Sequence, residues 1–238
     1  MTTANSVFLS TAALAALLSL QGCGVNAASA TESLASQGYS IDAKGVCKAA
    51  AKGDVGALRL LSQAGVASRS MVQEGDRFCF EAALLGRGGK VDVAAVLAEL
   101  KPATAELNRT YPSSTGMTTR DVPNADQLAR AAGHRPSSLY AGGQVVEATP
   151  LMWAVWAGDP AAVQALLAHG ADPNLPSHVA VQVSGKEVVV GEQTLKTSAT
   201  LVRISASPLF EAHRLQHNQI AQLLTRQGAK PSVSSAKV

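Results

Sequence analysis

The chain has few aromatic residues. Phe, Trp and Tyr make up 4% of its 238 residues, whereas hydrophobic residues make up 47%. A core built around large rings is therefore excluded, and the abundant Ala, Leu and Val can pack at close range. A chain of this length can bury an ordinary core in one or two domains. The composition favours short helices stacked against one another.

Long runs of basic residues are also missing. The formal net charge is only +3 at pH 7, and Lys and Arg are scattered along the chain. Nothing in this pattern can follow a phosphate backbone, so nucleic acid is not an expected partner. A small positive excess can still steer association with an acidic patch on a protein.

No motif of a known catalytic or cofactor site is present. The chain lacks the G-x-S-x-G, H-E-x-x-H and Rossmann glycine patterns, and it has no paired C-x-x-C motifs. The run Gly86–Lys90 lacks the spacing of a phosphate-binding loop, and Val91 stands where that loop needs Ser or Thr. His213 and His217 share one side of an expected helix, but a third metal ligand is missing. We therefore expect no enzyme activity, no cofactor and no metal site.

The one long apolar run, Val7 to Leu20, is too short for a membrane span, which needs about 20 residues. It is typical of the hydrophobic part of a secretory signal, although the preceding residues lack Lys and Arg. The sequence Leu20-Gln21-Gly22-Cys23 resembles a bacterial lipobox, which implies lipidation at Cys23 after removal of residues 1–22. Alternatively, cleavage after Val25-Asn26-Ala27 gives a soluble periplasmic protein, or the segment is not cleaved. The Ser- and Ala-rich residues 23–44 are expected to form a flexible tether.

Residues 149–174 contain start and stop signals for two short helices. Thr149-Pro150 opens the first helix, because Pro suits the first helical position, and Gly158 ends it. Asp159 caps a second helix over 160–169, which ends at Gly170 in the left-handed conformation.

This pattern is similar to the ankyrin repeat, whose consensus carries TPL in the first helix, a Gly before the second and a final LL-x-x-GAD-x-N. Three other segments keep parts of it: 44–65, 77–100 and 207–231. The resemblance implies an all-α fold, an ankyrin solenoid of four or five helix-turn-helix repeats over residues 45–232, with a small β-hairpin insertion.

Two insertions, 102–148 and 175–206, interrupt the repeats, and residues 233–238 are expected to form a tail. The first insertion contains a helix candidate over 125–132, between Asn124 and Gly133. The second contains two alternating segments joined by Ser184-Gly185, which predict a hairpin, and a third strand is expected over 201–204. Because both insertions precede a Thr-Pro-Leu or Ser-Pro-Leu, we expect them to extend from one edge of the stack and to belong to the binding face.

The resemblance also implies which residues face a partner, because the two residues before the junction Gly point to the concave surface of an ankyrin stack. Trp156 would then be an exposed aromatic anchor, with Ala157 beside it. Alternatively, the neighbouring insertion covers Trp156 and makes it part of the core. The other residues expected at a partner interface are Lys52, Arg214, Leu215 and, in the first insertion, Tyr140.

Cys47 and Cys79 lie almost one ankyrin period apart, in the first helices of neighbouring repeats. Packed helices are about 10 Å apart, whereas a disulfide needs Cα atoms within about 7 Å. Exported proteins can keep disulfides, so both a disulfide and two buried thiols remain open.

A solenoid offers a long rigid surface for recognising another protein. The resemblance to bacterial ankyrin lipoproteins implies a lipid-anchored periplasmic protein, monomeric when free, that binds a protein partner. The leading hypothesis is an immunity protein that inhibits a secreted antibacterial toxin by occlusion. The alternative is a periplasmic scaffold or accessory factor for an envelope or oxidative-stress enzyme; an effector delivered into a host cell and an unfamiliar enzyme are less favoured.

Overall fold

In the computed structural model, four pairs of short helices stack on one another and make up most of the helical part of the molecule. The structure describes residues 21–66, 73–74, 77–85, 91–112, 122–137, 143–184, 187–190, 193–196 and 200–237. The pairs are α3 (Ala43–Lys52) with α4 (Val55–Gln63), α5 (Cys79–Leu85) with α6 (Val93–Leu100), α9 (Pro150–Ala157) with α10 (Pro160–Ala168), and α11 (Pro208–Arg214) with α12 (Asn218–Arg226).

Side-chain caps set where these helices begin. The Thr149 hydroxyl accepts a hydrogen bond from the Met152 N–H, and the Asp159 carboxylate accepts from the N–H groups of Ala161 and Ala162. Each bond satisfies a backbone donor that lacks a partner inside the helix. Gly158 ends α9 with a φ of 68°, which glycine adopts without strain. The helix boundaries predicted from Thr149, Gly158 and Asp159 are therefore confirmed.

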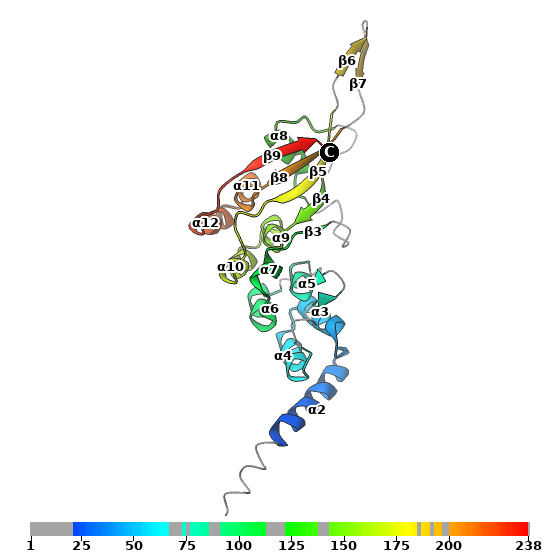
Figure 1. Cartoon of the computed structure of the whole chain (residues 1–238), viewed down its shortest axis with the longest axis vertical. Helices are drawn as coiled ribbons and strands as arrows, with labels where there is room; N and C mark the ends of the chain where they lie inside the picture. Colours follow the sequence, from blue (N-terminus) through cyan, green and yellow to red (C-terminus); the bar gives the residue numbers. More distant parts are fainter. Residues whose placement is uncertain are drawn as a thin grey trace, which may run out of the picture.

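The four pairs stack in two parallel rows. The first helices of the pairs, α3, α5, α9 and α11, pack in that order, and the second helices, α4, α6, α10 and α12, form the other row (Figure 1). Polar bonds join successive levels: Asn108 accepts a hydrogen bond from the Asp172 N–H at 2.7 Å, and Asn174 accepts one from the Lys230 N–H at 2.9 Å. The result is an elongated stack of helix pairs.

The segment expected to be a tether is a helix. Residues 21–36 form α2 (Gln21–Ser36), which packs against α4 at one end of the stack (Figure 1). Leu34 and Ala30 are completely buried there, and Tyr39 follows them into the same core. The tether prediction is wrong because these few apolar side chains complete the core of the first helix pair.

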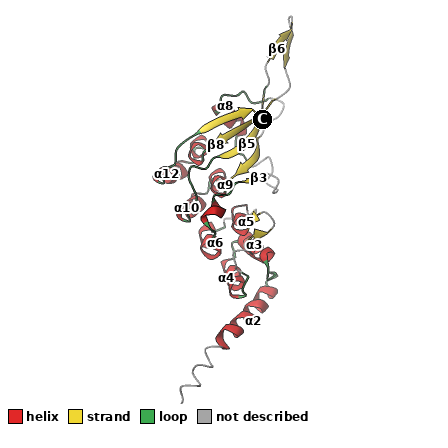
Figure 2. Ribbon diagram, viewed as in Figure 1, coloured by secondary structure: helices red, strands yellow, loops and turns green. Residues whose placement is uncertain are grey.

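The all-α prediction is also wrong. A five-stranded antiparallel sheet lies beside the last two helix pairs, and its strands are drawn in yellow in Figure 2. The strand order is β3-β4-β5-β8-β9. Its strands are β3 (Tyr111–Pro112), β4 (Gly143–Ala148), β5 (Ser177–Val183), β8 (Thr200–Ala206) and β9 (Val233–Lys237). Two short hairpins add β1 (Gln73–Glu74) with β2 (Arg77–Phe78), and β6 (Glu187–Val190) with β7 (Gln193–Lys196). The segments before α9 and α11 and the segment after α12 thus supply the strands of the five-stranded sheet.

Strand pairing differs from the sequence expectation. The two segments on either side of Ser184 do not pair with each other: β5 pairs with β8, while β6 pairs with β7 and extends the same connection into a projecting tip (Figure 1). The strand expected over 201–204 is present within β8. The predicted tail is instead the edge strand β9, which pairs with β8. Both differences come from pairing partners that lie far away in sequence.

Two further helices lie in the first predicted insertion. The four-residue α7 (Thr104–Leu107) follows α6, and α8 (Ala125–Ala131) packs against β5. The helix predicted between Asn124 and Gly133 is confirmed. Leu128 and Ala129 of α8 are completely buried in the larger of the two hydrophobic clusters, which also holds side chains from α9, α11 and the sheet.

Among the residues that the structure describes, no helix is long and apolar enough to cross a membrane.

Candidate functional site: the inner face of the helix stack

One side of the row α3-α5-α9-α11 is called here the inner face. It is the side that carries Lys48 of α3, Trp153 and Trp156 of α9, and Glu211 and Arg214 of α11. Gly53, Gly158 and Gln216 each follow the first helix of their pair and have positive φ, so they mark the same level. The residues five positions earlier are Lys48, Trp153 and Glu211, and those two positions earlier are Ala51, Trp156 and Arg214. These equivalent residues have very different surroundings.

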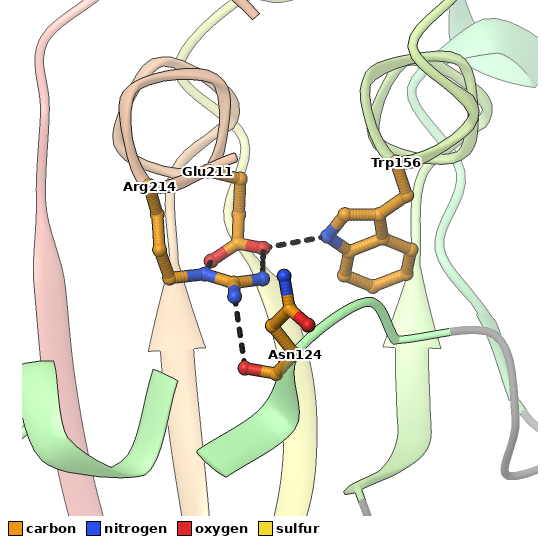
Figure 3. A network of polar contacts seen from close by, with 4 residues as sticks. All are labelled: Asn124, Trp156, Glu211 and Arg214. Atoms are coloured by element: carbon orange, nitrogen blue, oxygen red, sulfur yellow. Dashed lines mark hydrogen bonds and ion pairs between the residues drawn. The ribbon is translucent and has the colours of Figure 1, made fainter. Parts of the chain in front are cut away.

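Trp156 is buried on this face. Its side chain is 6% exposed, and its indole N–H donates a 2.7 Å hydrogen bond to a carboxylate oxygen of Glu211 (Figure 3). The prediction of an exposed aromatic anchor is therefore wrong, and the alternative of a core residue applies. Buried indole N–H groups normally have a polar partner, which Glu211 supplies here.

Glu211 and Arg214 form an ion pair away from solvent. Glu211 is 0% exposed, the Arg214 side chain is 5% exposed, and the guanidinium Nε donates to the carboxylate at 2.9 Å. A second guanidinium nitrogen of Arg214 donates at 2.9 Å to the backbone carbonyl of Asn124, in the residues just before α8 (Figure 3). The expectation that Arg214 faces a partner is wrong, because this residue bonds to two parts of its own chain.

Sequence reasoning missed Glu211. Its signal is positional: a carboxylate stands at the level of the apolar Trp153, in the middle of a short helix that begins with Ser207-Pro208. An acidic residue at a core position needs a cation nearby, and Arg214 lies three residues later on the same side of the helix.

The first insertion covers this part of the inner face. Val122, Ala125, Leu128 and Ala129 are buried in the same cluster as Trp153, Trp156 and Leu209. The two tryptophan rings meet edge to face, with centroids 5.0 Å apart. Over α9 and α11, the surface on which a partner was expected is therefore occupied by the chain itself.

The inner face is open at α3. Lys44, Lys48 and Lys52 are exposed and lie four residues apart, so they follow one side of the helix. The ammonium groups of Lys48 and Lys52 lie 5.5 Å and 5.3 Å from the centroid of the Tyr39 ring, within the range of a cation–π contact. The prediction that Lys52 is accessible to a partner agrees with its exposure; its binding role stays a prediction.

Tyr39 is itself held in place. Its hydroxyl donates a 2.8 Å hydrogen bond to Asp54, the residue that caps α4. Burial, followed by this hydrogen bond and the negative charge of Asp54, raises the pKa of Tyr39 to about 12. The ring under the lysines is therefore a neutral phenol at physiological pH.

The other residues predicted to bind a partner have mixed positions. Ala157 is exposed and lines a groove of about 280 Å³ between the second and third helix pairs, whose walls are mostly small apolar residues. Leu215 is half-buried against the larger core cluster. Tyr140 lies outside the described residues. His213 and His217 do not share a helix, since α11 ends at Arg214 and His217 precedes α12.

Cys47 and Cys79 form a disulfide between α3 and the start of α5, with Cα atoms 4.2 Å apart. Of the two alternatives that the sequence left open, the structure contains the covalent one. Both residues are buried, at 8% and 0% exposure, so the bond links the first two helix pairs inside the core.

Within the described ranges, no three residues among His, Cys, Asp and Glu gather closely enough to bind a metal ion. His213 lies in α11 and His217 precedes α12, so the two histidines belong to different elements, and the glycine-rich run Gly86–Lys90 lies outside the described residues.

Residues 147–178 match the family model described as ankyrin repeat. This stretch is similar to an ankyrin repeat. It contains the end of β4, the whole α9–α10 pair and the first residues of β5. Comparison with curated proteins gave no match, and comparison with solved structures gave none either. Ankyrin repeats are interaction modules that are typically not enzymes, so the match indicates a protein partner for this chain.

Proposed function

We propose that this protein is an exported, lipid-anchored ankyrin-repeat protein of the bacterial periplasm that binds a protein partner. The observation that carries the binding role is the ankyrin repeat at residues 147–178, set in a stack of four helix pairs. Such a stack presents a rigid surface at little entropic cost to the binder.

Two features support the export part of the proposal. The apolar run Val7 to Leu20 followed by Leu20-Gln21-Gly22-Cys23 has the order of a lipoprotein signal. The disulfide between Cys47 and Cys79 supports export independently of the leader, because such bonds persist in oxidising compartments and are rare in the cytosol. Lipidation at Cys23, which lies in the first turn of α2, would attach the protein to the membrane at the start of this helix.

The finer hypothesis is that the partner is a secreted antibacterial toxin and that the protein acts as an immunity protein. Inhibition would occur by occlusion, through surfaces other than Trp156 and Arg214, which are buried. A periplasmic scaffold for an envelope or oxidative-stress enzyme is the alternative within the same binding role.

The test is affinity capture with the full chain, expressed with its leader in a bacterial host and carrying a C-terminal tag. Envelope and secreted fractions are passed over the captured protein, and bound proteins are identified by mass spectrometry. A stoichiometric protein whose toxic activity falls as this chain is added supports the immunity role. A stoichiometric envelope enzyme without toxicity supports the scaffold role. Recovery of no stoichiometric protein would overturn the binding proposal.

A further inference from the structure

Binding over the C-terminal half of the inner face is restricted by the chain itself. Trp156 is buried there, the Arg214 side chain is 5% exposed, and the Asn124 carbonyl accepts a hydrogen bond from Arg214. Leu128 of α8 is completely buried in the same cluster. A partner could reach these positions only by removing α8 from the core.

The equivalent positions in the first helix pair are uncovered. Lys48 stands at the level of Trp153 and Glu211, yet it is exposed, and Lys44 and Lys52 extend the exposed row along α3. The row of Lys44, Lys48 and Lys52 is called here the lysine face. The inner face is covered over α9 and α11, whereas at α3 it is accessible and carries charge.

None of the three lysines forms an ion pair within the described part of the chain, although the charge of Asp42 interacts with that of Lys44. The ion pairs found there are Arg59–Glu99 and Arg214–Glu211, and none involves these lysines. Two carboxylates lie close in sequence, but both are used as helix caps: Asp42 accepts from the Gly45 N–H, and Asp54 accepts from the Ala57 N–H and the Tyr39 hydroxyl.

Two of the ammonium groups are also positioned. Lys48 and Lys52 both lie over the Tyr39 ring, and Lys48 donates a 2.8 Å hydrogen bond to the carbonyl of Gly38. Side chains held in this way lose less freedom on binding than free lysines do. Fixed ammonium groups suit a partner whose carboxylates are also fixed, whereas a fluid lipid surface requires no such positioning.

We infer that the lysine face of α3 is the docking surface for an acidic segment of the protein partner. This inference rests on the proposed binding function and specifies where the partner binds and what chemistry it presents. Carboxylates of the partner pair with Lys44, Lys48 and Lys52, while α8 keeps the inner face closed over α9 and α11.

The test uses the full chain and a fluorescein-labelled decaglutamate peptide as the acidic probe, with binding followed by fluorescence anisotropy at low and high NaCl. The test variant is Lys44→Gln/Lys48→Gln/Lys52→Gln. The matched control is Lys101→Gln/Arg226→Gln/Lys230→Gln, which removes three exposed charges elsewhere. Circular dichroism melting curves establish that both variants are folded.

The wild type should bind the peptide, and the affinity should fall as salt rises. The lysine-face variant should bind about tenfold more weakly, as expected for three exposed charge pairs, and the control should stay within about twofold of the wild type. Absence of binding by the wild type, or an equal loss in both variants, would overturn the inference. Vesicles of phosphatidylglycerol and phosphatidylcholine form a second arm: binding to the anionic vesicles without binding to the peptide would assign the face to a membrane and also overturn it.

Failure of this inference can be distinguished from failure of the proposed function. If the wild type and the lysine-face variant capture the same stoichiometric protein with equal affinity, protein binding stands and the lysine face is not its docking surface. If neither captures a protein, the proposed function itself fails, whatever the peptide does.

Discussion

The indole nitrogen of Trp156 donates a 2.7 Å hydrogen bond to Glu211, which lies 55 residues further along the chain. This bond joins α9 to α11 across the boundary between two helix pairs, and Arg214 extends it to the residues before α8. Three elements that are distant in sequence therefore meet at the ion pair of Glu211 and Arg214. The arrangement closes the inner face over the last two helix pairs.

Replacing Arg214 should destabilise the protein strongly. Arg214→Met leaves Glu211 buried without its cation, which costs about 3 to 5 kcal/mol in the free energy of unfolding. Urea denaturation followed by circular dichroism measures this loss. The control Arg226→Met removes an exposed charge and should change stability by no more than about 0.5 kcal/mol. The double variant Glu211→Leu/Arg214→Met should recover part of the loss in the free energy of unfolding. A loss in the double variant equal to the sum of the losses of Glu211→Leu and Arg214→Met would contradict the buried pair.

Shortening a buried side chain of α8 should show whether this helix belongs to the core. Leu128→Ala removes a completely buried side chain and should cost about 2 to 5 kcal/mol. Gln127→Ala, its exposed neighbour on the same helix, is the matched control and should be nearly neutral. Equal stability of the two variants in urea would mean that α8 is not packed on the inner face.

Removing the disulfide should loosen the first helix pair. The bond closes a loop with a sequence separation of 32 residues, for which chain entropy gives about 3 to 4 kcal/mol. We expect the free energy of unfolding of Cys47→Ala/Cys79→Ala, measured by urea denaturation, to be lower by that amount. Thiol titration of the unfolded protein without reductant should find Cys47 and Cys79 unreactive; two additional reactive thiols would contradict the bond.

Tyr39 should ionise later than an ordinary tyrosine. Its folded-state pKa is raised from 10.0 to about 12, so its contribution to stability is complete below pH 10 and is lost as the pH rises toward 12. Ultraviolet titration of the folded protein should show one late phenol that is absent in Tyr39→Phe. Unfolding at high pH should also depend less steeply on pH in this variant. A single ordinary titration step for all tyrosines would contradict the burial of Tyr39.

The helix pairs could be predicted because their signals are local. Thr149, Asp159 and Gly158 each act within a few residues of their own position, so the sequence alone places the ends of α9 and α10. The resemblance to the ankyrin repeat depends on the same local pattern. These residues specify the same structure wherever the rest of the chain lies.

The sheet and the closed inner face could not be predicted, because their partners are distant in sequence. Alternating residues around Ser184 fit a local hairpin as well as the observed pairing, and only the position of β8 decides between them. Similarly, Trp156 looks like an exposed anchor until Asn124 and α8 are placed against it. The chemistry of Glu211 depends on Arg214 and on burial, which a single sequence does not reveal.

Hydrogen–deuterium exchange of the full chain, free and bound to its captured partner, tests most directly the claim that this protein binds through the open end of its inner face. The account predicts that the partner slows exchange over residues 44–52 of α3 and leaves exchange over residues 125–131 of α8 unchanged. Unchanged exchange in α3, together with altered exchange in α8, would contradict it.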